Sequence, residues 1–109
     1  MKKNILFVCT GNTCRSPMAE ALLHQKAGDR YDVRSAGISA PGGQPAAEPA
    51  VQALAELNIP LKHRSRPIDK SLAEWADLIL TMTQHQKAVV GQMVPESLGK
   101  VFTLKEYAG

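Results

Sequence analysis

The chain lacks the apolar run of about 18 residues that a transmembrane helix needs. Its basic start, Met1 to Asn4, precedes only a short apolar run without an Ala-x-Ala-like cleavage site, which argues against a secretory signal peptide. Aromatic residues make up 5% of the chain, and its basic residues are scattered, although the net charge is +3. A nucleic-acid-binding protein normally concentrates its basic residues in one stripe. We therefore expect a cytoplasmic protein that binds neither a membrane nor nucleic acid.

Cysteine and histidine are also sparse. The chain has two cysteines, Cys9 and Cys14, far fewer than the disulfide framework of a small secreted protein. Its three histidines are widely separated, without the spacing of a zinc site, so we expect no metal ion. No Gly-x4-Gly-Lys motif occurs, which excludes a Walker-type nucleotide site, and we expect no cofactor. Redox chemistry or a catalytic thiol remains as the use of a cysteine here.

What the sequence does contain is an alternation of strand-like and helix-like segments over 109 residues, enough for one domain. Apolar runs predict strands at 4–9, 31–36, 77–82 and 101–104. Helical patterns predict helices at 16–28, 48–57, 72–75 and 83–93, and residues 62–67 form a basic connector. This order predicts an α/β fold: a four-stranded, mostly parallel sheet with helices on both faces.

Residues 9–16 lie between the first expected strand and the first expected helix. Ligands of α/β proteins bind at this edge of the sheet, where backbone N–H groups converge and the helix dipole adds about half a positive charge. Gly11 permits a backbone turn that a Cβ would hinder. Arg15 offers a planar fork of donors for two phosphoryl oxygens, and Ser16 is expected as the helix N-cap. The segment therefore predicts a phosphate-binding loop after strand 1.

Cys9 stands at the edge of this predicted loop. The loop amides, the helix dipole and Arg15 all favour the thiolate form of Cys9, which makes it the predicted nucleophile. A plain packing role is the alternative for a cysteine at a strand end. The Cys-x5-Arg-Ser spacing at a strand–helix junction, with a glycine inside, favours the catalytic role.

The run from Phe7 to Glu20 resembles the signature of the low-molecular-weight protein tyrosine phosphatase family. Segments 35–37 and 76–82 match the same family in the same order, so the resemblance covers essentially the whole chain. It implies that Cys9 attacks phosphorus and that water then hydrolyses the phosphocysteine.

The resemblance also implies a role for each residue of the loop. The residues expected to bind phosphate are Thr10, Gly11, Asn12, Thr13, Cys14 and Arg15. Ser16 hydrogen-bonds the Cys9 sulfur and helps it to leave, and Asn12 holds the geometry of the loop. For Asn12 the alternative is a routine turn residue.

One part of the family pattern is not found in residues 1–109. The family's general acid is an Asp in an Asp-Pro loop after the fourth strand, followed by a C-terminal helix, and the sequence ends at Gly109 before either. We expect residues 1–109 to be one phosphatase domain, as a fragment of a longer protein. The alternative is an enzyme that lacks its proton donor. Glu106 is the only carboxylate near the end and is a poor replacement.

Thr13 and Cys14 bear on substrate and regulation. By resemblance, tyrosine-directed members carry an aliphatic residue at the position of Thr13, whereas bacterial protein arginine phosphatases carry Thr. Phosphoarginine in proteins is therefore the expected substrate, with phosphotyrosine as the alternative. Cys14 is either a small buried loop residue or, by resemblance, the redox partner that bonds Cys9 under oxidation.

Two further classes compete with a phosphatase. Thioredoxin-coupled arsenate reductases share the loop but need two further cysteines, which this sequence does not contain. A non-hydrolytic phosphate-binding or phosphocysteine carrier module would need no general acid. Nothing in the sequence indicates an oligomeric state.

Overall fold

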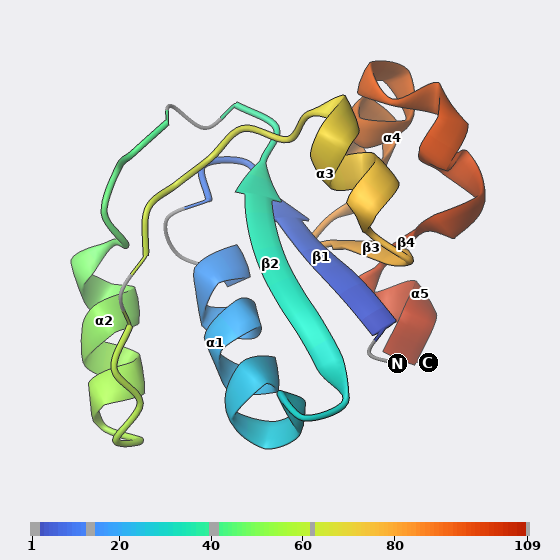
Figure 1. The fold of residues 1–109 in the computed structure, drawn as a ribbon. Helices are drawn as coiled ribbons and strands as arrows, with labels where there is room; N and C mark the ends of the chain where they lie inside the picture. The colour runs from blue at the N-terminus through green and yellow to red at the C-terminus, as the bar shows by residue number, and fades with distance from the viewer. Residues whose placement is uncertain (1–2, 13–14, 40–41, 62, 109) are drawn as a thin grey trace.

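The computed structural model describes residues 3–12, 15–39, 42–61 and 63–108. Its strands are β1 (Lys3–Cys9), β2 (Tyr31–Gly37), β3 (Leu78–Thr81) and β4 (Val101–Thr103), all parallel, in the order β2-β1-β3-β4 (Figure 1). Its helices are α1 (Arg15–Ala27), α2 (Glu48–Ala55), α3 (Lys70–Trp75), α4 (Gln84–Met93), the 3-10 helix η1 (Pro95–Lys100) and α5 (Leu104–Ala108). The expected α/β fold is confirmed. Within the described ranges, no helix is long and apolar enough to cross a membrane.

The sheet is covered on both faces, because alternate residues of its strands point to opposite sides. On one face Leu6, Val8 and Ile79 are fully buried and pack in one cluster with residues of α3 and α4. On the other face Ile5 and Phe7 belong to a second cluster, which includes residues of α1 and the first residue of α5. Central strands buried on both sides explain why their sequences are continuous apolar runs.

The strand order places the loop after β1 at a switch point. From β1 the chain passes through α1 to β2 on one side, and after β2 it returns across β1 to β3 on the other side. Connections that leave β1 and β3 in opposite directions open a crevice at the carboxyl ends of these strands. The residues that follow Cys9 enter this crevice.

Local capping signals explain where α3 and α4 begin. Asp69 accepts a hydrogen bond from the N–H of Leu72 and caps α3. Thr83 caps α4 in a capping box with Gln86. Ser16 does not follow this pattern. It is the second residue of α1 and not the expected N-cap, because its hydroxyl turns toward Cys9 and Asn12.

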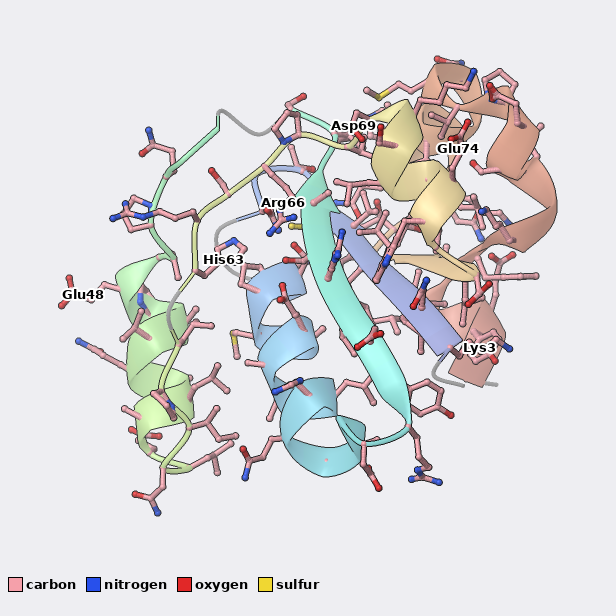
Figure 2. All side chains as sticks on the ribbon, viewed as in Figure 1. Lys3, Glu48, His63, Arg66, Asp69 and Glu74 are labelled. Carbon is pink, nitrogen blue, oxygen red and sulfur yellow. The ribbon has the colours of Figure 1, made fainter. Side chains whose placement is uncertain are left out.

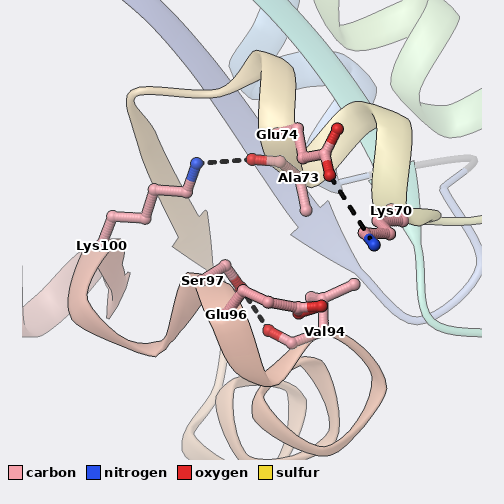
Figure 3. Close-up of a pocket in the computed structure, with 7 residues that line it drawn as sticks. All are labelled: Lys70, Ala73, Glu74, Val94, Glu96, Ser97 and Lys100. Atoms are coloured by element: carbon pink, nitrogen blue, oxygen red, sulfur yellow. Dashed lines mark hydrogen bonds and ion pairs between the residues drawn. The ribbon is translucent and has the colours of Figure 1, made fainter.

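Two short helices, η1 and α5, were not expected. In a cavity of about 230 Å³ between α3 and η1, Lys100 reaches from the end of η1 to the carbonyl oxygen of Ala73 (Figure 3). Lys100 also donates to the carbonyl oxygen of Ala76. A cation at the C-terminus of a helix complements the dipole of that helix. The cavity includes no residue of the 9–16 loop, so we assign it to the packing of α3 against η1.

A reciprocal capping box begins α5. The backbone N–H of Thr103 donates to Glu106 Oε1, and the N–H of Glu106 donates to Thr103 Oγ1. Lys87 also donates to the same carboxylate at 2.9 Å. The Thr103 N–H first, and then Lys87, lower the pKa of Glu106 to about 2. Glu106 is therefore an ionised structural carboxylate.

This lowered pKa predicts a pH-dependent contribution to stability. A carboxyl group whose pKa is lower in the folded protein than in the unfolded chain stabilises the fold at pH values above the unfolded pKa. This stabilisation is lost as the pH falls to the folded pKa. Glu106→Gln should lower Tm at neutral pH, and the difference from the parent should vanish between pH 4.5 and about 2. The matched control is Glu74→Gln, which removes an exposed pair with Lys70 at 4.0 Å. A Tm difference for Glu106→Gln that does not change with pH would contradict the assignment.

Candidate active site

Cys9 ends β1 with its sulfur facing the turn that follows. The residue is 6% exposed, and its Sγ lies 2.9 Å from Ser16 Oγ and 3.2 Å from the backbone nitrogen of Asn12. The Asn12 N–H donates to the sulfur. Donors placed beside a sulfur atom stabilise negative charge that develops on it during a reaction.

The side chain of Asn12 fixes which group donates at Ser16. The N–H of Arg66 points at one side-chain atom of Asn12 at 2.9 Å, and this atom must therefore be the acceptor Oδ1. The amide nitrogen Nδ2 then faces Ser16 Oγ at 2.8 Å and donates to it. When Cys9 is a thiolate, which has no proton to donate, the Ser16 hydroxyl donates its own proton to Cys9 Sγ. A directional chain of hydrogen bonds thus ends at the sulfur.

The basic connector between α2 and α3 packs against the loop, which the sequence did not reveal. His63 Nε2 donates to the carbonyl oxygen of Asn12 at 2.7 Å, so this ring nitrogen carries a proton. The carbonyl of Arg66 accepts from the N–H of Gly37, the last residue of β2. His63 and Arg66 thus lie at the carboxyl end of β1 and β2, whereas Lys3 lies at the opposite end of the sheet (Figure 2).

A second unexpected support comes from α4. Gln86 is 6% exposed, and its Oε1 accepts from the N–H groups of Met82 and Thr83. Its Nε2 donates to Thr10 Oγ1 at 3.1 Å. The carbonyl of Thr10 accepts a further hydrogen bond from the N–H of Ser39. Gln86 therefore ties the start of the loop to the turn between β3 and α4.

Of the other predicted site residues, some are described by the structure and two are not. Arg15 is the first residue of α1 and is exposed, and its guanidinium forms no ion pair with a residue that the structure describes. Gly11 is half-buried in the turn. Thr13 and Cys14 lie outside the described residues. The structure thus brings the Cys9 sulfur together with two predicted residues of the loop, Asn12 and Ser16, and places Arg15 at the start of the helix that follows.

Comparison with known proteins agrees with this geometry. A family model for low molecular weight phosphotyrosine protein phosphatase matches residues 4–109. A protein-arginine-phosphatase of Bacillus subtilis (strain 168) is 49% identical over 107 residues, covering 95% of this chain and 71% of the relative. A probable low molecular weight protein-tyrosine-phosphatase of Ralstonia solanacearum, EpsP, is 47% identical, covering 97% and 73%.

A solved structure is similarly close. In it, a mutant of the YwlE arginine phosphatase carries a phosphorylated serine in its active site. It matches with a TM-score of 0.93 and 48% identity, covering 95% of this chain and 70% of that one. The chain therefore spans about seven tenths of the length of these relatives.

Gln86 offers a test of how the loop is supported. Gln86→Leu keeps the volume but removes the side-chain acceptor of the Thr83 N–H and one of the two acceptors of the Met82 N–H, which also donates to the carbonyl of Val8. Each lost hydrogen bond costs about 0.5–1.5 kcal/mol. We expect a lower free energy of unfolding and weaker binding of inorganic phosphate. Chemical denaturation and phosphate inhibition measure the two effects. Gln92→Leu, on an exposed position of α4, is the control. Unchanged phosphate binding in Gln86→Leu would show that Thr10 does not need this support.

Proposed function

The chain belongs to the low molecular weight phosphotyrosine protein phosphatase family, and we propose that it hydrolyses phosphoarginine in proteins through a phosphocysteine on Cys9. The observation that carries this mechanism is the position of the Cys9 sulfur, which receives hydrogen bonds from the Asn12 N–H and Ser16. This sulfur stands at the start of a strand-to-helix loop suited to an anion.

In the first step, Cys9 Sγ attacks phosphorus and the bond from phosphorus to the leaving nitrogen breaks. The loop amides and the exposed guanidinium of Arg15 hold the phosphoryl oxygens, where charge accumulates during transfer. Arg15 suits this role because it begins α1, beside the positive end of the helix dipole.

In the second step, water attacks phosphorus and the bond from sulfur to phosphorus breaks. The electron pair returns to Cys9, which leaves as a thiolate. Ser16 and the Asn12 N–H stabilise this leaving group, because the hydrogen-bond chain described above points a proton from each of them at the sulfur. Inorganic phosphate then departs.

The leaving group of the first step also needs a proton. Glu106 does not supply it, since its carboxylate is held by Thr103 and Lys87 and stays ionised above a pH of about 2. The resemblance assigns this role to an Asp in an Asp-Pro loop, and we assign it to no residue of 1–109.

The choice of phosphoarginine rests on Thr13. Overall identity does not decide between substrates, because the arginine-directed relative is 49% identical and the probable tyrosine-directed one is 47% identical. A threonine hydroxyl can pair with the N–H groups of a phosphorylated guanidinium, whereas an aliphatic residue suits a phenol ring. Phosphotyrosine in proteins is the second candidate. The expected cytoplasmic location and the redox pairing of Cys9 with Cys14 stay predictions.

Replacing the nucleophile separates chemistry from binding. Cys9→Ser should abolish hydrolysis of p-nitrophenyl phosphate yet keep affinity for phosphate or vanadate, because the loop amides and Arg15 remain. Steady-state kinetics and oxyanion titration measure the two properties. Arg15→Gln is the converse variant and should lose oxyanion affinity. Turnover by Cys9→Ser within about tenfold of the parent, which corresponds to only about 1.4 kcal/mol of barrier, would exclude Cys9 as nucleophile.

Replacing the hydroxyl of Thr13 tests whether the enzyme prefers phosphoarginine or phosphotyrosine. Thr13→Ile should lower kcat/KM for phosphoarginine and raise it for phosphotyrosine, because it removes a hydrogen-bond partner and adds apolar surface. A buried donor without a partner costs about 1–3 kcal/mol, which is about five- to a hundred-fold in the ratio. Thr13→Ser, which keeps the hydroxyl, is the control and should preserve the preference. A parent that prefers phosphotyrosine would overturn the arginine assignment and leave the general phosphatase mechanism intact.

A further inference from the structure

The basic connector between α2 and α3 has a fixed backbone and exposed charges. The N–H of Ser65 donates to the carbonyl of Gln44 at 2.7 Å, and its carbonyl accepts from the N–H of Gly43 at 2.8 Å. A bridge between Pro45 and Arg64 continues this antiparallel pairing. On either side of Ser65, Arg64 and Arg66 are exposed. The chain thus holds two arginines on an immobilised segment beside the loop.

Their positive charge is not neutralised nearby. Among the described residues, neither Arg64 nor Arg66 forms an ion pair, and the side chain of Arg64 donates to the carbonyl of Gly43, at 3.3 Å. The segments 37–47 and 59–68 contain no Asp or Glu. Two acids border these segments. Glu48 begins α2, and its carboxylate points outward from the molecule, away from Arg66 (Figure 2). Asp69 caps α3, where its carboxylate accepts from the N–H of Leu72. Unpaired exposed charge of one sign attracts a partner of the opposite sign.

A groove accompanies these charges. It has a volume of about 510 Å³ and is lined by Pro45, Ala46, Val51, Leu61, His63 and Arg64. Four of these side chains are apolar, and the two basic ones lie on the connector. His63 both lines the groove and donates to the carbonyl of Asn12 in the phosphate-binding loop. One residue therefore borders the groove on one side and the predicted site of chemistry on the other.

We propose that this groove, with Arg64 in its wall and the exposed Arg66 two residues further along the connector, binds the polypeptide that flanks the phosphorylated residue, and that it selects acidic flanks. This inference rests on the proposed function and names the class of protein that the site takes. The apolar wall suits the body of an extended chain, and the two guanidinium groups suit Asp or Glu side chains near the phosphorylated residue. Free phosphoarginine has no flank and gains nothing from the groove.

The expected preference is modest and depends on salt. Exposed ion pairs contribute little individually, so each arginine should change kcat/KM by about two- to five-fold. Because exposed charges are screened at high ionic strength, raising it from about 0.02 to 0.5 M should remove most of the preference. This measurement needs no substitution and therefore does not depend on whether a variant folds.

The experiment compares three synthetic peptides with one central phosphoarginine, flanked by Glu, by Gln or by Lys. The readout is the ratio of kcat/KM values within each protein, so a general loss of activity cancels. We expect the order Glu, Gln, Lys in the full-length parent. The double variant Arg64→Gln with Arg66→Gln should bring the ratios close to one. The charge reversal, Arg64→Glu with Arg66→Glu, should invert the order, which a merely structural role of these side chains would not do.

Arg30→Glu is the matched control. It reverses an exposed charge of the same kind just before β2, at the opposite end of the sheet, and should keep the order of the parent. Equal kcat/KM values for the three peptides in the parent would overturn the docking groove and leave the phosphatase function standing. An order that persists in the charge reversal would also overturn it. Failure to hydrolyse any peptide, with p-nitrophenyl phosphate also left intact, would overturn the proposed function and this inference with it.

Discussion

Asn12 adopts a left-handed backbone conformation, with φ 55°, and is fully buried. For most residues this conformation costs about 1–2 kcal/mol, so the surrounding contacts must hold it. Each polar group of Asn12 has a partner: its N–H binds Cys9, its carbonyl binds His63, and its side chain joins Arg66 to Ser16. The direction of the turn after β1, and with it the position of every loop amide, depends on these contacts.

The same contacts join the nucleophile to the surface that surrounds it. The connector between α2 and α3 supplies two of the partners of Asn12, and it also carries two exposed arginines, of which Arg64 lines the groove. Helix α4 supports the loop independently, through Gln86 and Thr10. The α2–α3 connector and α4 are both far from the loop in the sequence. The loop therefore has its geometry only when these segments are folded against the sheet. A short segment of eight residues could not hold it alone.

This dependence also explains what the sequence could predict. Strands were predictable because Leu6, Val8 and Ile79 belong to continuous apolar runs, and Asp69 and Thr83 carry local capping signals. The supports of the loop were not, since Asn12 meets His63 and Arg66 across 51 and 54 positions and Thr10 meets Gln86 across 76. The sequence of a basic segment such as 62–67 does not show whether the segment is exposed to solvent or packs against another part of the protein. Helix α5 was missed because its cap, Thr103, also reads as a strand residue.

The chemistry explains why asparagine suits position 12. Glycine would adopt φ 55° freely but would bring no amide group to Arg66 or Ser16. Aspartate could accept from the Arg66 N–H, yet it has no N–H to donate to Ser16 Oγ. The Ser16 hydroxyl would then turn to the carboxylate and leave the sulfur, and a negative charge would stand where a thiolate and a phosphoryl group must be stabilised. Only asparagine combines tolerance of the left-handed backbone with a donor and an acceptor on one short side chain, so that the proton of Ser16 stays directed at Cys9.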